Sequence, residues 1–137
     1  MYPPELVAPM KADLTSAGFE ELVSGQDVDH VLTDSESSVL LVINSVCGCA
    51  AGNARPGVKQ ALQHTKVPDK LVTVFAGVDK DATEQARKYM LPYPPSSPAI
   101  ALFKEGKLAH MLERHHIEGR PAEMIAENLK AAFDECL

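Results

Sequence analysis

The chain has 137 residues, which suits a single globular domain spanning residues 1–137. Hydrophobic residues make up 45% of the sequence and charged residues 23%, a balance that argues against an intrinsically disordered chain. The 13 Lys and Arg residues against 19 Asp and Glu residues give a net charge of -6. This acidic balance disfavours nucleic acid and anionic membrane surfaces as partners, because both attract basic proteins.

The lack of a recognisable targeting signal and the use of cysteine both indicate a reducing compartment. No run of the sequence approaches the ~20 apolar residues that a membrane span requires. Residues 1–14 lack the basic start, apolar centre and cleavage site of a signal peptide, so we expect a cytoplasmic protein. The three cysteines are an odd number, and Cys47 and Cys49 lie one residue apart. In a reducing compartment that clustering indicates chemistry or metal binding before a structural disulfide.

The first 35 residues show the spacing of helices with interruptions. Apolar residues recur every four positions from Leu6 to Leu14 and continue beyond Gly18, which is typical of a helical face. Proline is awkward inside a helix, so Pro9 is expected at a first turn. A second short helix is expected after Gly25.

Two buried strands and two helices are predicted in the middle of the chain. Residues 38–46 form a near-continuous apolar and β-branched run, typical of a central strand buried on both faces. Residues 50–64 have helical spacing, residues 71–76 form a second apolar run, and a helix capped by Asp79 or Asp81 is predicted to run to about Met90. The proline-rich residues 91–98 end that helix as a rigid loop.

The C-terminal part is predicted to be a hairpin followed by a helix. Residues 98–103 form a third strand, residues 104–107 a turn, and residues 108–112 a fourth strand. Residues 119–133 form an amphipathic helix, with Met124 on its buried face. The alternation of strands and helices predicts an α/β protein with a mixed, mostly parallel sheet covered on both sides and finished by an antiparallel hairpin.

Cys47, Gly48 and Cys49 lie where a predicted strand passes into a predicted helix. Active sites in such sheets lie beyond the carboxyl ends of the strands, so chemistry is expected here. The unpaired N–H groups and the dipole at a helix start favour a thiolate, which is the nucleophilic form of cysteine. We therefore predict a redox-active pair, with Cys47 as the nucleophile before the helix and Cys49, shielded in the first turn, as the resolving thiol.

The spacing of the pair limits how it closes. Side chains two positions apart on a helix point to nearly opposite sides, so Cys47 must precede the first turn and Gly48 must relax the backbone. A ring this small is expected to be strained and readily reduced. Two other interpretations stay open: two ordinary buried small residues, or a zinc site completed by His115 and His116.

Pro98 carries a second signal, because it directly precedes a buried strand. A cis Ser97–Pro98 bond would turn the backbone toward the cysteines and expose main-chain groups to an extended substrate. The alternative is a trans proline that only limits the strand, as is usual for X–Pro bonds. We predict the cis bond because of the cysteine pair that accompanies the proline.

The strand, cysteine pair and helix, together with PAIALFKEGK at residues 98–107, resemble a thioredoxin-fold protein. Over almost the whole chain the sequence resembles the bacilliredoxin family more closely. The segments that carry this resemblance are MYPPELVAPM, NSVCGCAAGNARPG, PPSSPAIALF and RHHIEGR. The resemblance implies a thioredoxin-like fold and thiol–disulfide exchange at a Cys-Gly-Cys site. In that family the exchange removes bacillithiol from mixed disulfides on protein cysteines.

A substrate groove is expected beside the thiols, shaped by Pro98 and Ser97, with Gly48 at its edge and Asn44 and Ser45 lining the approach. Neither a cofactor nor a resident metal is expected, because the sulfurs carry the electrons and no phosphate-cradling loop is present. Bacillithiol or another low-molecular-weight thiol would be the co-substrate, and proteins carrying mixed disulfides would be the partners.

Departures from ordinary thioredoxins narrow the function. The spacer between the cysteines is one residue, the chain has no tryptophan, and Leu41 stands where thioredoxins resemble one another in holding a buried acid. These differences argue against a general thioredoxin-like reductase. Two other classes stay open, a zinc- or copper-binding module that uses the same thiolates and a non-catalytic interaction domain. Cys136 is expected to be exposed or half-packed on the last helix, with an accessory resolving role as the alternative.

Overall fold

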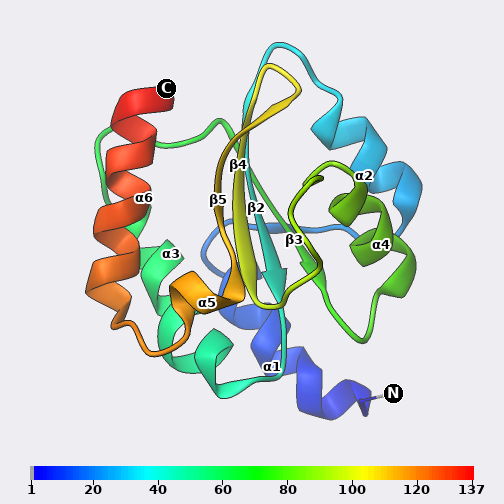
Figure 1. The fold of residues 1–137 in the computed structure, drawn as a ribbon. Helices are drawn as coiled ribbons and strands as arrows, with labels where there is room; N and C mark the ends of the chain where they lie inside the picture. Colours follow the sequence, from blue (N-terminus) through cyan, green and yellow to red (C-terminus); the bar gives the residue numbers. More distant parts are fainter. Residues whose placement is uncertain (1) are drawn as a thin grey trace.

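The apolar runs of the sequence form the strands of one five-stranded sheet, and amphipathic segments cover both of its faces (Figure 1). The computed structural model describes residues 2–137. Its elements in chain order are α1 (Pro4–Thr15), β1 (Glu20–Glu21), α2 (Gly25–Leu32), β2 (Ser38–Asn44), the π-helical turn η1 (Ala50–Ala54), α3 (Arg55–Ala61), β3 (Lys70–Phe75), α4 (Lys80–Lys88), β4 (Ala99–Lys104), β5 (Lys107–Leu112), α5 (Arg114–Ile117) and α6 (Ala122–Cys136).

The sheet has the strand order β1-β3-β2-β4-β5. It is mixed and ends in the β4–β5 hairpin, as predicted, but it is not mostly parallel. Only β1–β3 and β3–β2 are parallel, whereas β2–β4 and β4–β5 are antiparallel. β4 runs against β2 because the chain returns from α4 to the carboxyl end of β2, where Ala99 pairs with Ile43. This return brings the residues before β4 beside the residues that follow β2.

The N-terminal region differs from its prediction in two ways. The helix α1 begins at Pro4 and continues through Pro9, which was expected to start it. Pro9 is exposed, so the carbonyl group that lacks its amide partner can bond to water. The short strand β1 was expected to continue a helical face. It forms instead because Glu20 and Glu21 pair with the edge of β3.

The C-terminal region contains two helices where one was predicted. The short α5 ends before Gly119, whose φ of 78° is easily adopted only by glycine, and α6 begins three residues later. The later start of α6 turns Met124 away from the core, and this side chain is 53% exposed. Its predicted place on the buried face is therefore wrong, while Ile125 is buried.

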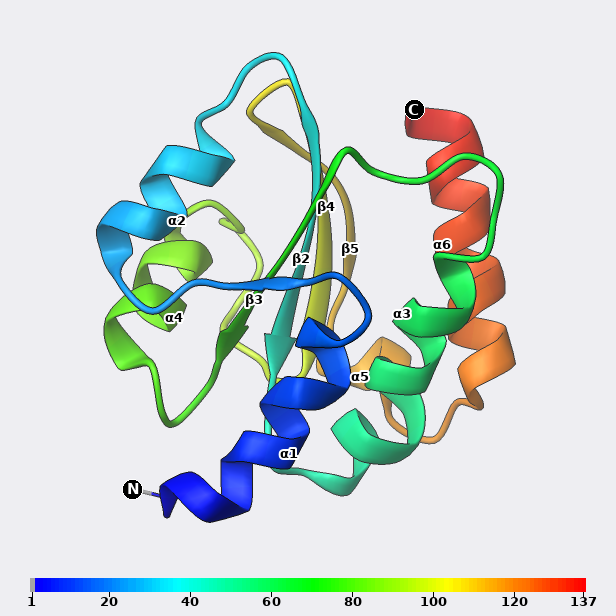
Figure 2. The same ribbon diagram turned by 180° about the vertical axis from the view of Figure 1, so that it is seen from behind.

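Two apolar cores lie on opposite faces of the sheet (Figures 1 and 2). Successive residues of β2 alternate between them, with Leu40 and Val42 in the core under α1, α3 and α6, and Leu41 and Ile43 in the core under α2 and α4. This alternation follows from the two-residue period of a strand. Among residues 2–137, no helix is both long and apolar enough to cross a membrane.

Gly57 of α3 lies close against α6. A Cβ atom added at Gly57 would lie 2.7 Å from Cγ2 of Ile125 and 3.4 Å from the carbonyl oxygen of Ala122. We expect Gly57→Ala to lower the free energy of unfolding by about 1–3 kcal/mol, because an inserted methyl group in a close-packed core forces its neighbours apart. Urea unfolding of the two proteins measures this difference.

Gly52 offers a matched control for that substitution. It lies in η1, and an added Cβ atom would meet nothing within 4 Å. Gly52→Ala is therefore expected to be neutral or slightly stabilising. Equal losses of stability in the two variants would contradict the assignment of the Gly57 effect to packing against α6.

Candidate active site at the carboxyl end of β2

Cys47 and Cys49 lie in the turn that leads from β2 into the helical segment. Cys47 is in a bend, and its carbonyl oxygen accepts hydrogen bonds from the N–H groups of Ala50 (3.0 Å) and Ala51 (3.3 Å). Cys47 thus precedes the first helical turn and Cys49 lies in it, as predicted. The two residues are joined by a disulfide, with their Cα atoms 5.5 Å apart. Gly48 between them is exposed, and an added Cβ atom would meet nothing within 4 Å.

The Ser97–Pro98 peptide bond is cis, which confirms the prediction from sequence. Pro98 directly precedes Ala99, the residue of β4 that pairs with Ile43 near the end of β2. The register of the two strands therefore places Ser97 and Pro98 beside the cysteine turn. A second cis bond, Leu91–Pro92, lies in the same loop and was not predicted.

A cleft of about 300 Å³ opens beside Cys47, and we call it the Cys47 cleft. It lies where the chain leaves β2 and β3 and where it approaches β4. Its lining residues are Tyr2, Ser45, Val46, Cys47, Ala76, Gly77, Arg87, Ser97 and Arg114. Cys49 is not among them, although both cysteines are half-buried. The cleft, and not the shielding of Cys49 expected from sequence, is what distinguishes the two thiols.

Asn44 does not line the approach to the thiols, so this part of the prediction is corrected. Its side chain is 1% exposed and donates to the carbonyl oxygen of Met10 at 3.1 Å. Its Oδ1 atom accepts from the backbone N–H of Ser45 at 2.9 Å. Ser45 does line the cleft, and its hydroxyl oxygen accepts from the N–H of Cys47 at 3.3 Å. Asn44 therefore supports the cysteine turn from the buried side, while Ser45 lines the Cys47 cleft.

A buried arginine that sequence reasoning missed lies behind this turn. Arg55 is 5% exposed, and its Nη1 atom donates to Asn44 Oδ1 at 2.9 Å and to the carbonyl oxygen of Ser45 at 3.2 Å. Its Nε atom donates to Asp13 Oδ2 at 3.0 Å, and Lys59 also donates to that carboxylate. Arg55 lies three residues before the core residue Val58 on a helical face, and this spacing was the available signal.

The Asp13 carboxylate is held in its ionised form by these cations. Burial alone would raise the pKa of Asp13, but the hydrogen bonds from Lys59 and Arg55 outweigh burial and lower the pKa below its ordinary value of 3.8. Asp13 comes from α1 and Arg55 from α3. The ion pair therefore ties two helices to the end of β2 beneath the cysteine turn.

Cys136 lies in the last turn of α6, is half-buried, and packs against the core under that helix. This agrees with the half-packed position expected for it. The C-terminal end of α6 lies at the opposite end of the sheet from the carboxyl end of β2 (Figures 1 and 2). Cys136 is thus separated from the cysteine turn by the length of the sheet, and this conformation gives it no resolving role.

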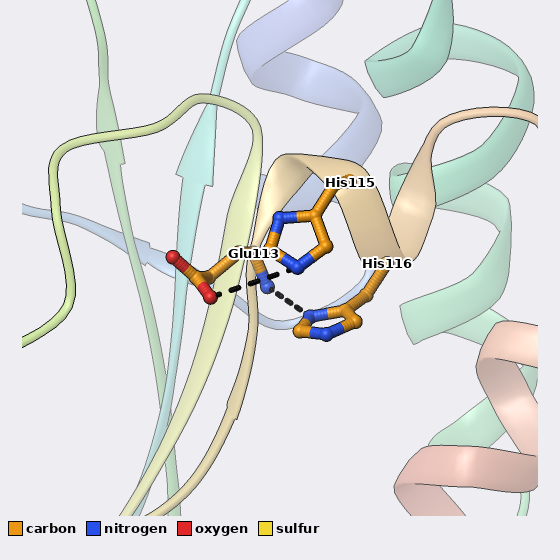
Figure 3. Close-up of side chains that lie close together, drawn as sticks. All are labelled: Glu113, His115 and His116. Atoms are coloured by element: carbon orange, nitrogen blue, oxygen red, sulfur yellow. Dashed lines mark hydrogen bonds and ion pairs between the residues drawn. The ribbon is translucent and has the colours of Figure 1, made fainter.

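Glu113, His115 and His116 form the one cluster of potential metal ligands within residues 2–137 (Figure 3). The cluster does not include Cys47 or Cys49, so the zinc site considered from sequence, with two thiolates and two imidazoles, is not assembled in this structure. The Nδ1 atom of His116 accepts from the N–H of Glu113 at 3.0 Å, as in a capping box at the start of α5. This capping hydrogen bond thus accounts for the position of His116 in the cluster.

The cap at His116 makes stability depend on pH. Burial lowers the pKa of His116, and the nearby charge of His115 lowers it further, against an opposing effect of Glu113. A depressed pKa favours the neutral ring in the folded state. The stabilisation is therefore fully present above the ordinary pKa of 6.5 and is lost as the pH falls below it.

We expect His116→Gln to reduce the loss of stability between pH 7.5 and pH 5, because glutamine can accept the same capping bond but does not titrate. The free energy of unfolding at pH 7.5 should fall by less than about 1 kcal/mol. Urea unfolding at both pH values measures the change. A variant with the same pH difference as the unsubstituted protein would show that His116 does not carry it.

Thioredoxins are among the solved structures that are similar to this fold. Oxidised mitochondrial thioredoxin 3 from Saccharomyces cerevisiae has a TM-score of 0.59 and 13% identity, covering 90% of this chain and 98% of that one. Oxidised thioredoxin O2 from Arabidopsis thaliana has a TM-score of 0.55 and 15% identity, covering 88% and 96%. These similarities confirm the predicted thioredoxin-like fold.

Sequence comparison identifies the family. A family model described as Disulphide isomerase matches residues 2–136. A protein of Cytophaga hutchinsonii named Bacilliredoxin is 62% identical over 135 residues, covering 98% of this chain and 99% of its own. Bacilliredoxin BH1716 of Halalkalibacterium halodurans is 48% identical over 134 residues, covering 98% and 93%. The fold and the Cys-Gly-Cys pair define a thiol–disulfide oxidoreductase. Within that class, the chain belongs to the bacilliredoxin family.

Proposed function

We propose that this oxidoreductase removes bacillithiol from mixed disulfides on protein cysteines. The Cys47 thiolate attacks the bacillithiol sulfur, the S–S bond to the substrate protein breaks, and the protein leaves as a thiolate. The Cys49 thiolate then attacks the Cys47 sulfur and expels bacillithiol as its thiolate. The products are the reduced substrate protein, free bacillithiol and the Cys47–Cys49 disulfide, which two further thiol groups must reduce, themselves becoming a disulfide, before the next turnover.

The observation that carries this proposal is the position of Cys47 in an open cleft with Cys49 as its bonded partner. A nucleophile must reach a disulfide on another protein, and Cys47 lines the opening whereas Cys49 does not. Ser97 lies in the same cleft, next to the cis proline. An extended substrate segment would therefore lie beside Ser97 and the attacking sulfur.

Intact mass spectrometry tests the transfer. The reduced protein is mixed with a bacillithiolated substrate protein, and in parallel with the same protein carrying glutathione. We expect the bacillithiolated substrate to lose the mass of bacillithiol and the enzyme to lose two hydrogens, which map to the peptide with Cys47 and Cys49. Faster release of glutathione than of bacillithiol would refute bacillithiol as the co-substrate. Pairing of either active-site cysteine with Cys136 would refute the mechanism.

Disulfide isomerase activity is a second candidate function, and the description of the matching family model favours it. Isomerisation needs the same attack by Cys47 on a protein disulfide, followed by release through another thiol of the substrate. We expect the reduced protein to reactivate scrambled ribonuclease in a thiol buffer faster than the buffer alone. No acceleration at a concentration that supports removal of bacillithiol would exclude this activity.

A further inference from the structure

The Cys47 cleft is lined by basic and not by acidic side chains, although the protein as a whole is acidic. The net charge of the chain is -6, yet two of the residues that line this cleft are arginines, Arg87 and Arg114. No Asp or Glu of residues 2–137 lines it. Arginines in the same cleft as Cys47, with no carboxylate among its lining residues, favour an anionic molecule there.

Arg87 has unused hydrogen-bonding capacity. It comes from the last turn of α4, and its Nε atom is buried without a hydrogen-bond partner among residues 2–137. The ion pairs within these residues do not include Arg87. The buried Nε atom is closed to a molecule in the cleft, so an anionic group there would meet the other guanidinium nitrogens, and an arginine fork suits a carboxylate in particular. Arg87 is therefore the best candidate to receive an anionic group.

Arg114 forms another part of the cleft wall and is partly committed. Its Nε atom donates to Glu118 at 2.8 Å, in an exposed pair whose charges water screens. Its Nη1 atom donates to the carbonyl oxygen of Ser97 at 3.1 Å. Arg114 thus fixes the backbone before Pro98 and adds positive potential, whereas no ion pair among residues 2–137 engages Arg87.

We propose that the Cys47 cleft recognises a small thiol by a carboxylate group, which Arg87 binds while the thiol sulfur lies at Cys47. The inference rests on the proposed removal of a small thiol and adds the side chain that recognises the charged group of that thiol. A cleft of about 300 Å³ is at the lower limit of small-ligand sites, so it suits such a thiol and not a folded protein. The substrate protein then approaches from the open side, past Ser97 and Pro98.

Three mixed disulfides on one carrier peptide test this proposal. The single cysteine of the peptide carries 3-mercaptopropionate, 2-mercaptoethanol or cysteamine, which are similar in size and are anionic, neutral and cationic. The rate at which the reduced enzyme releases each thiol is divided by the rate of release by dithiothreitol, because this ratio removes differences in intrinsic reactivity. We expect a ratio about tenfold higher for 3-mercaptopropionate than for 2-mercaptoethanol, and the lowest ratio for cysteamine.

Substitution of the arginine separates recognition from chemistry. Arg87→Gln should lower the ratio for 3-mercaptopropionate about tenfold and leave that for 2-mercaptoethanol within twofold. Arg120→Gln is the matched control, since it removes the same charge from an exposed residue outside the cleft. It should change every ratio by less than twofold. A thermal melt of each variant confirms that it is folded. If a variant does not fold, the ratios of the unsubstituted enzyme for the three thiols still test the proposal.

The outcomes distinguish a failure of carboxylate recognition from a failure of thiol removal. Equal ratios for the three thiols in the unsubstituted enzyme would overturn carboxylate recognition and leave the thiol-transfer function intact. An equal loss for all three thiols in Arg87→Gln would assign Arg87 to structure and not to recognition. Release of none of the three above the uncatalysed rate would overturn thiol removal itself, and carboxylate recognition with it.

Discussion

Cys47→Ser should reduce removal of a protein-bound small thiol to the uncatalysed rate, a loss on the order of 10³-fold or more. The reason is positional. Cys47 lines the open cleft and its thiolate makes the first bond to the incoming sulfur, whereas Cys49 lies outside that cleft. A serine hydroxyl is not ionised at neutral pH and cannot take over the attack. The measurement is the appearance of free substrate thiol after one round with modified protein.

Cys49→Ser should separate the two steps of the same reaction. The first transfer stays intact, and the enzyme accumulates with the small thiol on Cys47, because no neighbouring thiolate is left to expel it. Free small thiol supplied in excess should restore turnover by taking over that role. Cys136→Ser is the control and should behave like the unsubstituted enzyme, since Cys136 lies at the far end of α6. An adduct on Cys49 in the Cys47→Ser protein, with none on Cys47 in the Cys49→Ser protein, would reverse the roles.

The centre of the site could be predicted from sequence because its signals are local. A buried strand, two cysteines one residue apart and a helix lie within one short segment, so the position of Cys47 before the first turn follows from helix geometry alone. The cis Ser97–Pro98 bond was predictable only in combination with the cysteines. Asn44 was assigned to the approach, yet the last residue of a strand can point inward as readily as outward, and Asn44 is buried.

The remainder of the site depends on contacts between distant segments. Arg87 and Arg114 look like ordinary surface charges in their own helices, and the fold alone brings them to the cleft of Cys47. The direction of β4 was likewise beyond local patterns, because an apolar run reads the same in either direction. The short β1 exists through pairing with β3, and no two-residue pattern predicts such an edge.

Arg55 should be the most important polar side chain for stability. It is 5% exposed and donates to Asp13, to Asn44 and to the carbonyl oxygen of Ser45. Arg55→Met keeps an apolar stem of similar length but leaves these acceptors short of a donor. We expect the free energy of unfolding at pH 7 to fall by about 2–3 kcal/mol, below the full cost of an unpaired buried charge because Asp13 keeps Lys59 as a partner.

The matched control is Lys59→Met, which removes the other cation from the same carboxylate. The Lys59 side chain is 40% exposed, so its ion pair is screened by water and its loss should cost less than about 1 kcal/mol.

The pH dependence of stability gives a second comparison, because these cations lower the pKa of Asp13 below its ordinary value of 3.8. The stabilisation from a depressed carboxyl pKa is present above that value and is lost as the pH falls through the folded-state pKa. Urea unfolding should therefore show a larger loss for Arg55→Met at pH 7 than at pH 3. If the loss is the same at both pH values, or if Lys59→Met costs as much, the Arg55–Asp13 pair does not make the contribution to stability assigned to it here.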